Sequence, residues 1–147
     1  MSRYRTGYRL ERRVESLYTR HGWLATRFPK SGRRFYPADV LAVKRFANRT
    51  LIHLVECKNL SKKDQEKNAI YISSEQIQRL IDKARMHQAE AFVAYSFPHQ
   101  HAQVIEANRL KSSGKMLSVE REDGVPLKKL LKRMGQTKLL PEYVIKV

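Results

Sequence analysis

Two acidic side chains and one lysine interrupt otherwise apolar stretches of the chain, where charge is costly unless something compensates it. Asp39 stands near the start of ADVLAVKR (38–45), and Glu56 and Lys58 stand at the end of TLIHLVECK (50–58). If both stretches are strands of a hairpin, the two carboxylates can lie side by side as hard oxygen ligands for Mg²⁺. Such an ion lowers the pKa of a bound water and stabilises charge on a phosphate, which is the chemistry of phosphodiester hydrolysis.

The lysine beside the second carboxylate would complete such a site. Side chains alternate along a strand, so Glu56 and Lys58 would share one face, where the ammonium group could orient the attacking water or the phosphate. A role as base would require a lowered pKa, because an ordinary lysine has a pKa of about 10.4. Composition predicts roughly one acid-x-lysine spacing by chance, and the sequence contains one. The alternative is therefore that the strand ends at Glu56 and that water solvates both charges.

Other reactive side chains form weaker patterns. Glu11 lies among arginines in YRLERR, and the residues alone favour an ordinary ion pair on a helix surface. His53 interrupts an apolar stretch and fits a hydrogen-bonded core residue better than a metal ligand. The histidines form no zinc pattern, Ser31 lacks the Gly-x-Ser-x-Gly setting of serine hydrolases, and no GxxxxGK phosphate loop is present.

Positive charge is the strongest overall signal. The 147 residues carry 30 Lys and Arg against 14 Asp and Glu, for a net charge of +16 and a pI near 10.3. Such an excess repels itself unless a polyanion neutralises it, and nucleic acid is the commonest such partner. An anionic membrane surface is the alternative, but it usually requires an uninterrupted basic amphipathic helix. Three basic clusters flank the acidic candidates in sequence, as binding of a phosphate backbone requires: Arg3–Arg13, Lys30–Arg34 and Lys62–Lys67.

Length and composition indicate one domain. A chain of 147 residues with a hydrophobic fraction of 41% suffices for a single core. The lone Cys57 excludes an internal disulfide and suits a reducing interior. No stretch approaches the ~18 apolar residues of a membrane span, and the first residues lack the apolar stretch of a signal peptide. We therefore expect a cytoplasmic protein with a single domain over residues 1–147, whose last residues, 136–147, form a tail without an assigned role.

The proposed chemistry requires elements that bring the two carboxylates together. Helical spacing of apolar residues predicts a first helix over residues 7–21, with Gly22 as its C-cap. Apolar stretches bounded by turn residues predict three strands, over 23–28, 38–45 and 50–58. Only a short FANR turn separates the last two, so we expect a hairpin and, with the first strand, an antiparallel meander.

The second half of the sequence completes a mixed α/β fold. A Ser73–Gln76 capping box and an apolar stripe predict a helix over residues 73–88. The same patterns predict three later elements, namely strands over 89–97 and 102–107 and a helix over 125–135. The crossover through the helix should place the strand after it parallel to its neighbour. This order implies a mixed central β-sheet flanked by helices.

Six consecutive segments of the sequence resemble one known family, the archaeal-type Holliday junction resolvases. RTGYRLERRVESLYTRHGW resembles the opening arm and first helix, TRFPKSGRR the arginine- and serine-containing loop, PADVLAV the aspartate strand and HLVECKNLSKK the Glu-x-Lys strand. AIYISSEQIQRLIDKARMHQAEAFVAYSF resembles the following helix and strand, and DGVPLKKLLKR the closing segment. The resemblance covers roughly residues 3–133 and rests on the order of the motifs. The sequence departs from the family in a longer loop before Asp39, in the extra residue between Pro37 and Asp39, and in its tail.

The resemblance implies a restriction-endonuclease-like, PD-(D/E)xK nuclease fold and structure-selective cleavage of four-way DNA junctions by paired nicks. Asp39 and Glu56 would hold Mg²⁺, or Mn²⁺ as an alternative, with Glu11 assisting, Lys58 as the catalytic lysine and Ser31 as the catalytic-loop serine. A nucleoid-associated homodimer without a small-molecule cofactor would act on branched DNA, and a dimer suits the near two-fold symmetry of a junction. With the basic clusters, the expected DNA contacts are Arg5, Arg9, Arg12, Arg27, Lys30, Arg33, Arg34, Lys62 and Lys63.

Two other functions stay open from the sequence. The chain could be a restriction or repair nuclease of the same fold, and competition between linear and branched DNA would separate this case from a resolvase. It could instead be a basic nucleic-acid-binding protein with an inactive site. A labelled junction would then yield no product at any Mg²⁺ concentration.

Overall fold

The structure, a computed structural model, describes residues 3–28, 38–47, 49–60 and 68–137, with the backbone alone for residues 3–8 and 136–137. None of the described helices is long and apolar enough to cross a membrane. The elements follow one another as α1 (Arg3–Arg20), β1 (Leu24–Arg27), β2 (Val40–Phe46), β3 (Arg49–Asn59), β4 (Ala69–Ser73), α2 (Ser74–Met86), β5 (Glu90–Ser96), β6 (Gln103–Glu106), the short 3-10 helix η3 (Ala107–Arg109), β7 (Lys111–Ser113), β8 (Met116–Glu120), β9 (Val125–Pro126) and α3 (Leu127–Thr137).

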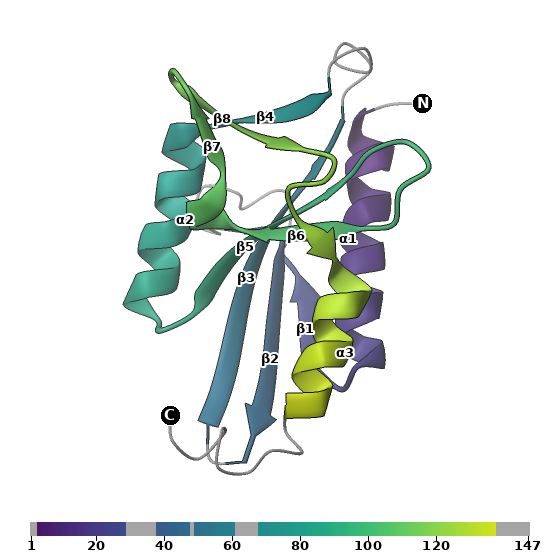
Figure 1. Cartoon of the computed structure of the whole chain (residues 1–147). Coiled ribbons are helices and arrows are strands. Elements are labelled where there is room, and N and C mark those ends of the chain that lie inside the picture. The colour runs from purple at the N-terminus through teal and green to yellow at the C-terminus, as the bar shows by residue number, and fades with distance from the viewer. Residues whose placement is uncertain (1–2, 29–37, 48, 61–67, 138–147) are drawn as a thin grey trace.

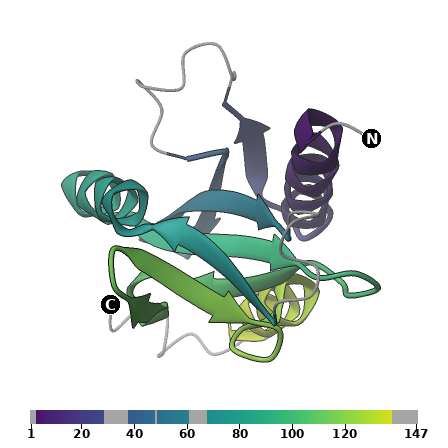
Figure 2. The same ribbon diagram turned by 90° about the horizontal axis from the view of Figure 1, so that it is seen from above.

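A six-stranded mixed sheet in the order β1-β2-β3-β5-β6-β9 forms the centre of the fold. The helices α1 and α3 cover one face of this sheet, and α2 covers the other (Figures 1 and 2). The strands β1, β2 and β3 pair antiparallel, whereas β5 pairs parallel with β3 after the crossover through α2. The predicted meander, the parallel crossover and the mixed sheet flanked by helices are therefore confirmed.

The first helix packs its apolar stripe against the sheet and stops at a glycine. Leu10, Val14 and Tyr18 are buried, as their helical spacing predicts. Gly22 has a φ of 86°, and the N–H of Trp23 donates to the carbonyl oxygen of Tyr18 at 3.0 Å across the helix end. Only a residue without a Cβ adopts this backbone conformation at little cost, so the predicted C-cap glycine is confirmed.

His53 lies on β3 in the middle of the core, as the sequence predicted for a hydrogen-bonded core histidine. Its Nδ1 is hydrogen-bonded to the hydroxyl of Tyr18 at 2.8 Å, and the ring centroids of Trp23 and Phe92 lie 4.6 and 4.5 Å from its own. Burial lowers the pKa of His53 to about 4. The Glu90 carboxylate is 3.8 Å from Nε2, but no ion pair forms at neutral pH because the imidazole is uncharged.

This buried histidine should make the stability of the fold depend on pH. Because the pKa of His53 is about 4 in the folded protein and near its ordinary 6.5 in the unfolded chain, the unfolded chain binds the extra proton between these values. The contribution to the free energy of unfolding is complete above pH 6.5 and falls by about 3 kcal/mol as the pH drops towards 4. Urea unfolding of the protein and of His53→Asn across this window measures it. Identical pH dependence in the two proteins would contradict a buried, neutral imidazole.

A second sheet of three strands, in the order β4-β8-β7, lies beside α2 and is missing from the sequence-based prediction (Figure 1). Ile70 and Ile72 of β4 and Val119 of β8 are buried in the same cluster as the apolar side of α2. The strands β7 and β8 form a hairpin around Gly114, whose φ is 67°. Strands of 3 to 5 residues contain too few alternations for a period of two to stand out, which is why they were missed.

Candidate active site

Asp39 immediately precedes β2 and is tied to β3 by both its backbone and its side chain. Its N–H donates to the carbonyl oxygen of Val55 at 3.0 Å, and its Oδ2 accepts a hydrogen bond from the N–H of Cys57 at 2.8 Å. The side chain is buried, with an exposed fraction of 5%. A carboxylate oxygen thus replaces a backbone acceptor where the regular β2–β3 pairing ends. Asp39 is therefore held against the segment that contains Glu56 and Lys58.

Glu56 lies on β3 next to the peptide group that binds Asp39. The nitrogen of Cys57 is two covalent bonds from the Cα of Glu56, so Oδ2 of Asp39 lies within roughly 5 Å of that Cα. The Glu56 side chain is 4% exposed, and its Oε1 accepts a hydrogen bond from Nε2 of Gln76 at 2.7 Å. The hairpin that was predicted to bring these two acidic segments together is confirmed.

Two further residues of the predicted site, Lys58 and Glu11, lie on β3 and on α1. Lys58 is half-buried and lies two residues beyond Glu56 on β3, so both side chains are on one face of the sheet. Glu11 lies on α1 and is 3% exposed. The surface position suggested by its arginine-rich surroundings is therefore wrong, because Glu11 is on the buried side of α1, next to the buried Leu10.

Asp39 and Glu56 are a suitable donor pair for a divalent ion. Carboxylate oxygens are the hard ligands that Mg²⁺ prefers, and a cation offsets the repulsion between two neighbouring buried carboxylates. Within the described ranges, no group of three or more Asp, Glu, His and Cys side chains is arranged to hold a metal ion. The structure thus holds the segments that carry Asp39 and Glu56 against each other.

Gln76 also belongs to this site, although its place in the sequence indicated only a capping role. The cap itself is confirmed, since Oγ of Ser73 accepts a hydrogen bond from the N–H of Gln76 at 3.1 Å. The Gln76 side chain, however, donates to Glu56. The available signal was a glutamine in the first turn of the helix that follows the Glu-x-Lys strand, but a capping box explains the same residue equally well.

The structure describes only some of the candidate DNA contacts. Arg9 and Arg12 are exposed on α1. Arg27 is half-buried, and its Nε lies 3.4 Å from the carboxylate of Glu15 in an ion pair. Arg5 is described by its backbone alone. The remaining candidates, together with the proposed catalytic-loop serine, lie outside the described residues: Lys30, Ser31, Arg33, Arg34, Lys62 and Lys63.

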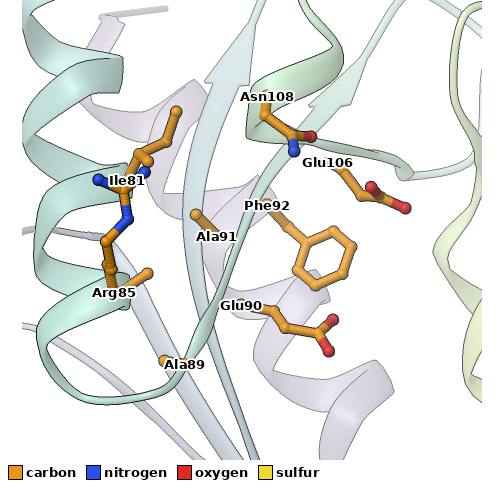
Figure 3. A pocket seen from close by; sticks show the side chains of 9 residues that line it. Ile81, Arg85, Ala89, Glu90, Ala91, Phe92, Glu106 and Asn108 are labelled. Atoms are coloured by element: carbon orange, nitrogen blue, oxygen red, sulfur yellow. The ribbon is translucent and has the colours of Figure 1, made fainter.

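A pocket of about 470 Å³ lies at the other end of α2, between this helix and β5 (Figure 3). Arg85, Glu90, Phe92 and Glu106 are among the residues that line it. Asp39, Glu56 and Lys58 are not among the residues that line it. The pocket and the carboxylate pair are therefore separate features of the molecule.

Both the sequence and the fold match known proteins. The family model for the archaeal Holliday junction resolvase (Hjc) matches residues 2–139. The structure of Hjc from Archaeoglobus fulgidus, described as a Holliday junction resolvase from an archaeal hyperthermophile, aligns with a TM-score of 0.67 and 20% identity. That alignment covers 86% of this chain and 96% of the other. D212, described as a nuclease from a fusselovirus, aligns with a TM-score of 0.50 and 13% identity, over 92% of this chain and 90% of its own.

These two structural likenesses show the fold, which is the restriction-endonuclease-like nuclease fold expected from the sequence. A search of curated proteins found no match. The family model carries the further step, because it spans nearly the whole sequence. The chain belongs to the archaeal Holliday junction resolvase family.

Proposed function

We propose that the chain resolves four-way DNA junctions as a structure-selective endodeoxyribonuclease, through Mg²⁺-dependent hydrolysis at a site built on Asp39 and Glu56. The activity is that of the family to which the chain belongs. The observation that carries the site assignment is the 2.8 Å hydrogen bond from the N–H of Cys57 to Oδ2 of Asp39, which joins the two acid-bearing segments. An excess of 16 positive charges suits a polyanionic substrate.

In this proposal Asp39 and Glu56 hold the Mg²⁺, for which Mn²⁺ can substitute, and Glu11 assists from α1. When bound, the ion supplies positive charge at the phosphate and lowers the pKa of a water. Lys58 contributes an ammonium group that stabilises negative charge on the phosphate during bond cleavage. Ser31 is assigned to the catalytic loop on the family resemblance alone.

The exposed arginines of α1, Arg9 and Arg12, are proposed to bind the phosphate backbone, together with Arg27 and the basic residues of segments 29–37 and 61–67. Contacts to phosphates fix the position of the DNA but do not read base edges. We therefore expect selection of the branched shape of the DNA rather than of a base sequence.

A competition assay separates a resolvase from another nuclease of the same fold. A labelled four-way junction is incubated with the protein and Mg²⁺, and unlabelled junction or linear duplex is added. We expect paired nicks, and competition by the junction that is about 10³-fold stronger than by the duplex. Equal competition by the duplex would favour a restriction or repair nuclease. Absence of product at any Mg²⁺ concentration would favour a DNA-binding protein without catalysis.

The proposal includes a homodimer. A four-way junction has near two-fold symmetry, so a dimer with a two-fold axis can present two equivalent sites to two strands. Sedimentation analysis of the purified protein should therefore give twice the mass of the 17.3 kDa chain. A monomer that nicks both strands of the junction in one binding event would contradict this assignment.

A further inference from the structure

The side chain of Gln76 links the acidic site to the beginning of α2. Its Nε2 donates to Oε1 of Glu56 at 2.7 Å, while its backbone N–H donates to Oγ of Ser73 at 3.1 Å. In a complete capping box the glutamine side chain would instead return to the backbone N–H of the cap residue. The capping role of the side chain is thus given up for a contact with a buried carboxylate.

The second sheet holds the beginning of α2 in place. Ser73 ends β4 and pairs with Met116 of β8, and α2 follows without a connecting loop. The N–H of Ser74 donates to the carbonyl oxygen of Lys115 at 3.2 Å, and the Ser74 hydroxyl donates to the same oxygen. The β7–β8 hairpin therefore fixes the first turn of α2, and with it the backbone of Gln76.

We propose that Gln76 is a positioning residue for the nuclease site, which orients the carboxylate of Glu56 towards the divalent ion and is itself held by the second sheet. This inference rests on the proposed function, in which Glu56 is a ligand. An N–H donated to one carboxylate oxygen restricts rotation of the group, so the ion meets a ligand that is already oriented. Partners that orient a ligand in this way typically contribute 10–100-fold to metal affinity.

Gln76→Met tests the proposal, because methionine keeps the length and helix propensity of glutamine but has no N–H to donate. Gln78→Met is the matched control, since Gln78 is exposed on the same helix and donates to Asp82 at 2.9 Å. We expect Gln76→Met to bind Mg²⁺ at least tenfold more weakly in calorimetry without DNA. It should also need correspondingly more Mg²⁺ for half-maximal cleavage, with unchanged affinity for the junction in the absence of metal. The control should match the unaltered protein.

Equal Mg²⁺ affinity in Gln76→Met and Gln78→Met would overturn the positioning role. That result differs from failure of the proposed function, in which the unaltered protein would neither bind the ion nor cut the junction.

A separate observation concerns the outer face of α3. Four cationic side chains are exposed there at helical spacing, while Leu127 and Leu131 are buried on the inner side. The helix contains no acidic residue, and its cations repel one another across spacings of four residues. Among the described residues, no ion pair joins an acidic side chain to any of these four: Lys128, Lys129, Lys132 and Arg133.

The neighbouring helix extends this positive face. On the same side of the sheet, α1 lies beside α3 and exposes Arg9, Arg12 and Arg13 (Figures 1 and 2). The exposed Lys111, by contrast, is paired with the carboxylate of Glu120 at 3.4 Å. We infer that the α3 face binds the phosphate backbone of a DNA arm, in addition to the contacts at the cleavage site. This inference also rests on the proposed DNA substrate.

Neutralising the four α3 cations to Gln tests this surface. Junction affinity is measured without divalent ions over a range of NaCl concentrations, and each phosphate contact contributes about 0.9 to the slope of log affinity against log salt. We expect the slope to fall by about 2 to 4 and the affinity at moderate salt to fall more than tenfold. The cleavage rate of this variant at saturating protein should equal that of the unaltered protein. The control neutralises exposed cations of α2, which stand among acidic residues: Arg79, Lys83 and Arg85. A slope and affinity no lower than those of this control would overturn the inference.

Discussion

Asp39→Asn is expected to keep junction binding and to reduce cleavage by about 10³-fold, which corresponds to about 4 kcal/mol of lost transition-state stabilisation. The asparagine retains an oxygen that can accept the hydrogen bond from Cys57, so the attachment of Asp39 to β3 should survive. It removes the negative charge, and a neutral amide is a weaker ligand for Mg²⁺ than a carboxylate. Single-turnover cleavage of a labelled junction, with binding measured separately without metal, gives both quantities.

Asp82→Asn is the matched control for this experiment. Asp82 is an exposed aspartate on α2, and its Oδ1 accepts a hydrogen bond from Gln78 at 2.9 Å. This variant should cut at the rate of the unaltered protein. Full cleavage by Asp39→Asn under Mg²⁺ would refute the site assignment, and equal losses in both variants would indicate a general effect of charge.

Lys58→Met is expected to lower cleavage at saturating Mg²⁺ by at least about 100-fold and to leave Mg²⁺ affinity unchanged. Methionine preserves the apolar stem of the half-buried side chain and removes the ammonium group, so packing on β3 should change little. The two substitutions thereby separate two roles, because Asp39→Asn should lower the affinity for Mg²⁺ and Lys58→Met should not. Cleavage rates and calorimetric Mg²⁺ titrations of both variants measure the difference.

An exposed lysine provides the comparison for Lys58. Lys83→Met on α2 removes the same charge away from the carboxylate pair and should cut normally. If Lys58→Met retained the rate of this control, the lysine would have no part in catalysis. If it lost Mg²⁺ affinity as Asp39→Asn does, its role would be to maintain the metal site.

The hairpin that carries the site was predictable because its signals are local. Two apolar stretches separated by four residues leave few ways to pair, so Asp39 and Glu56 had to approach one another once β2 and β3 formed. The parallel placement of β5 followed from the intervening helix in the same way. The side-chain bond between Asp39 and the backbone of Cys57 did not follow, because it forms where the regular pairing stops.

Glu11 and Gln76 are two residues whose surroundings could not be predicted from local sequence patterns. The arginines around Glu11 indicated a surface position, but burial depends on which side of α1 faces the sheet, and the tertiary packing decides that. Only the family resemblance implied a role for Glu11 beside the metal site instead of a place on the surface. For Gln76, a local explanation as a capping residue was available and partly right. Its contact with Glu56 depends on the position of α2, which the unpredicted second sheet helps to set.

Calorimetric titration of Mn²⁺ into the protein without DNA tests the central claim, that one divalent ion is shared by Asp39 and Glu56. The series comprises Asp39→Asn, Glu56→Gln and the double variant, and Glu56→Gln keeps an acceptor for the Gln76 amide. Two ligands of one ion act as a unit, so each single variant should bind at least about tenfold more weakly, and the double variant little more weakly than the worse single one. Single variants that bind Mn²⁺ as tightly as the unaltered protein, or losses that simply add in the double variant, would contradict the account.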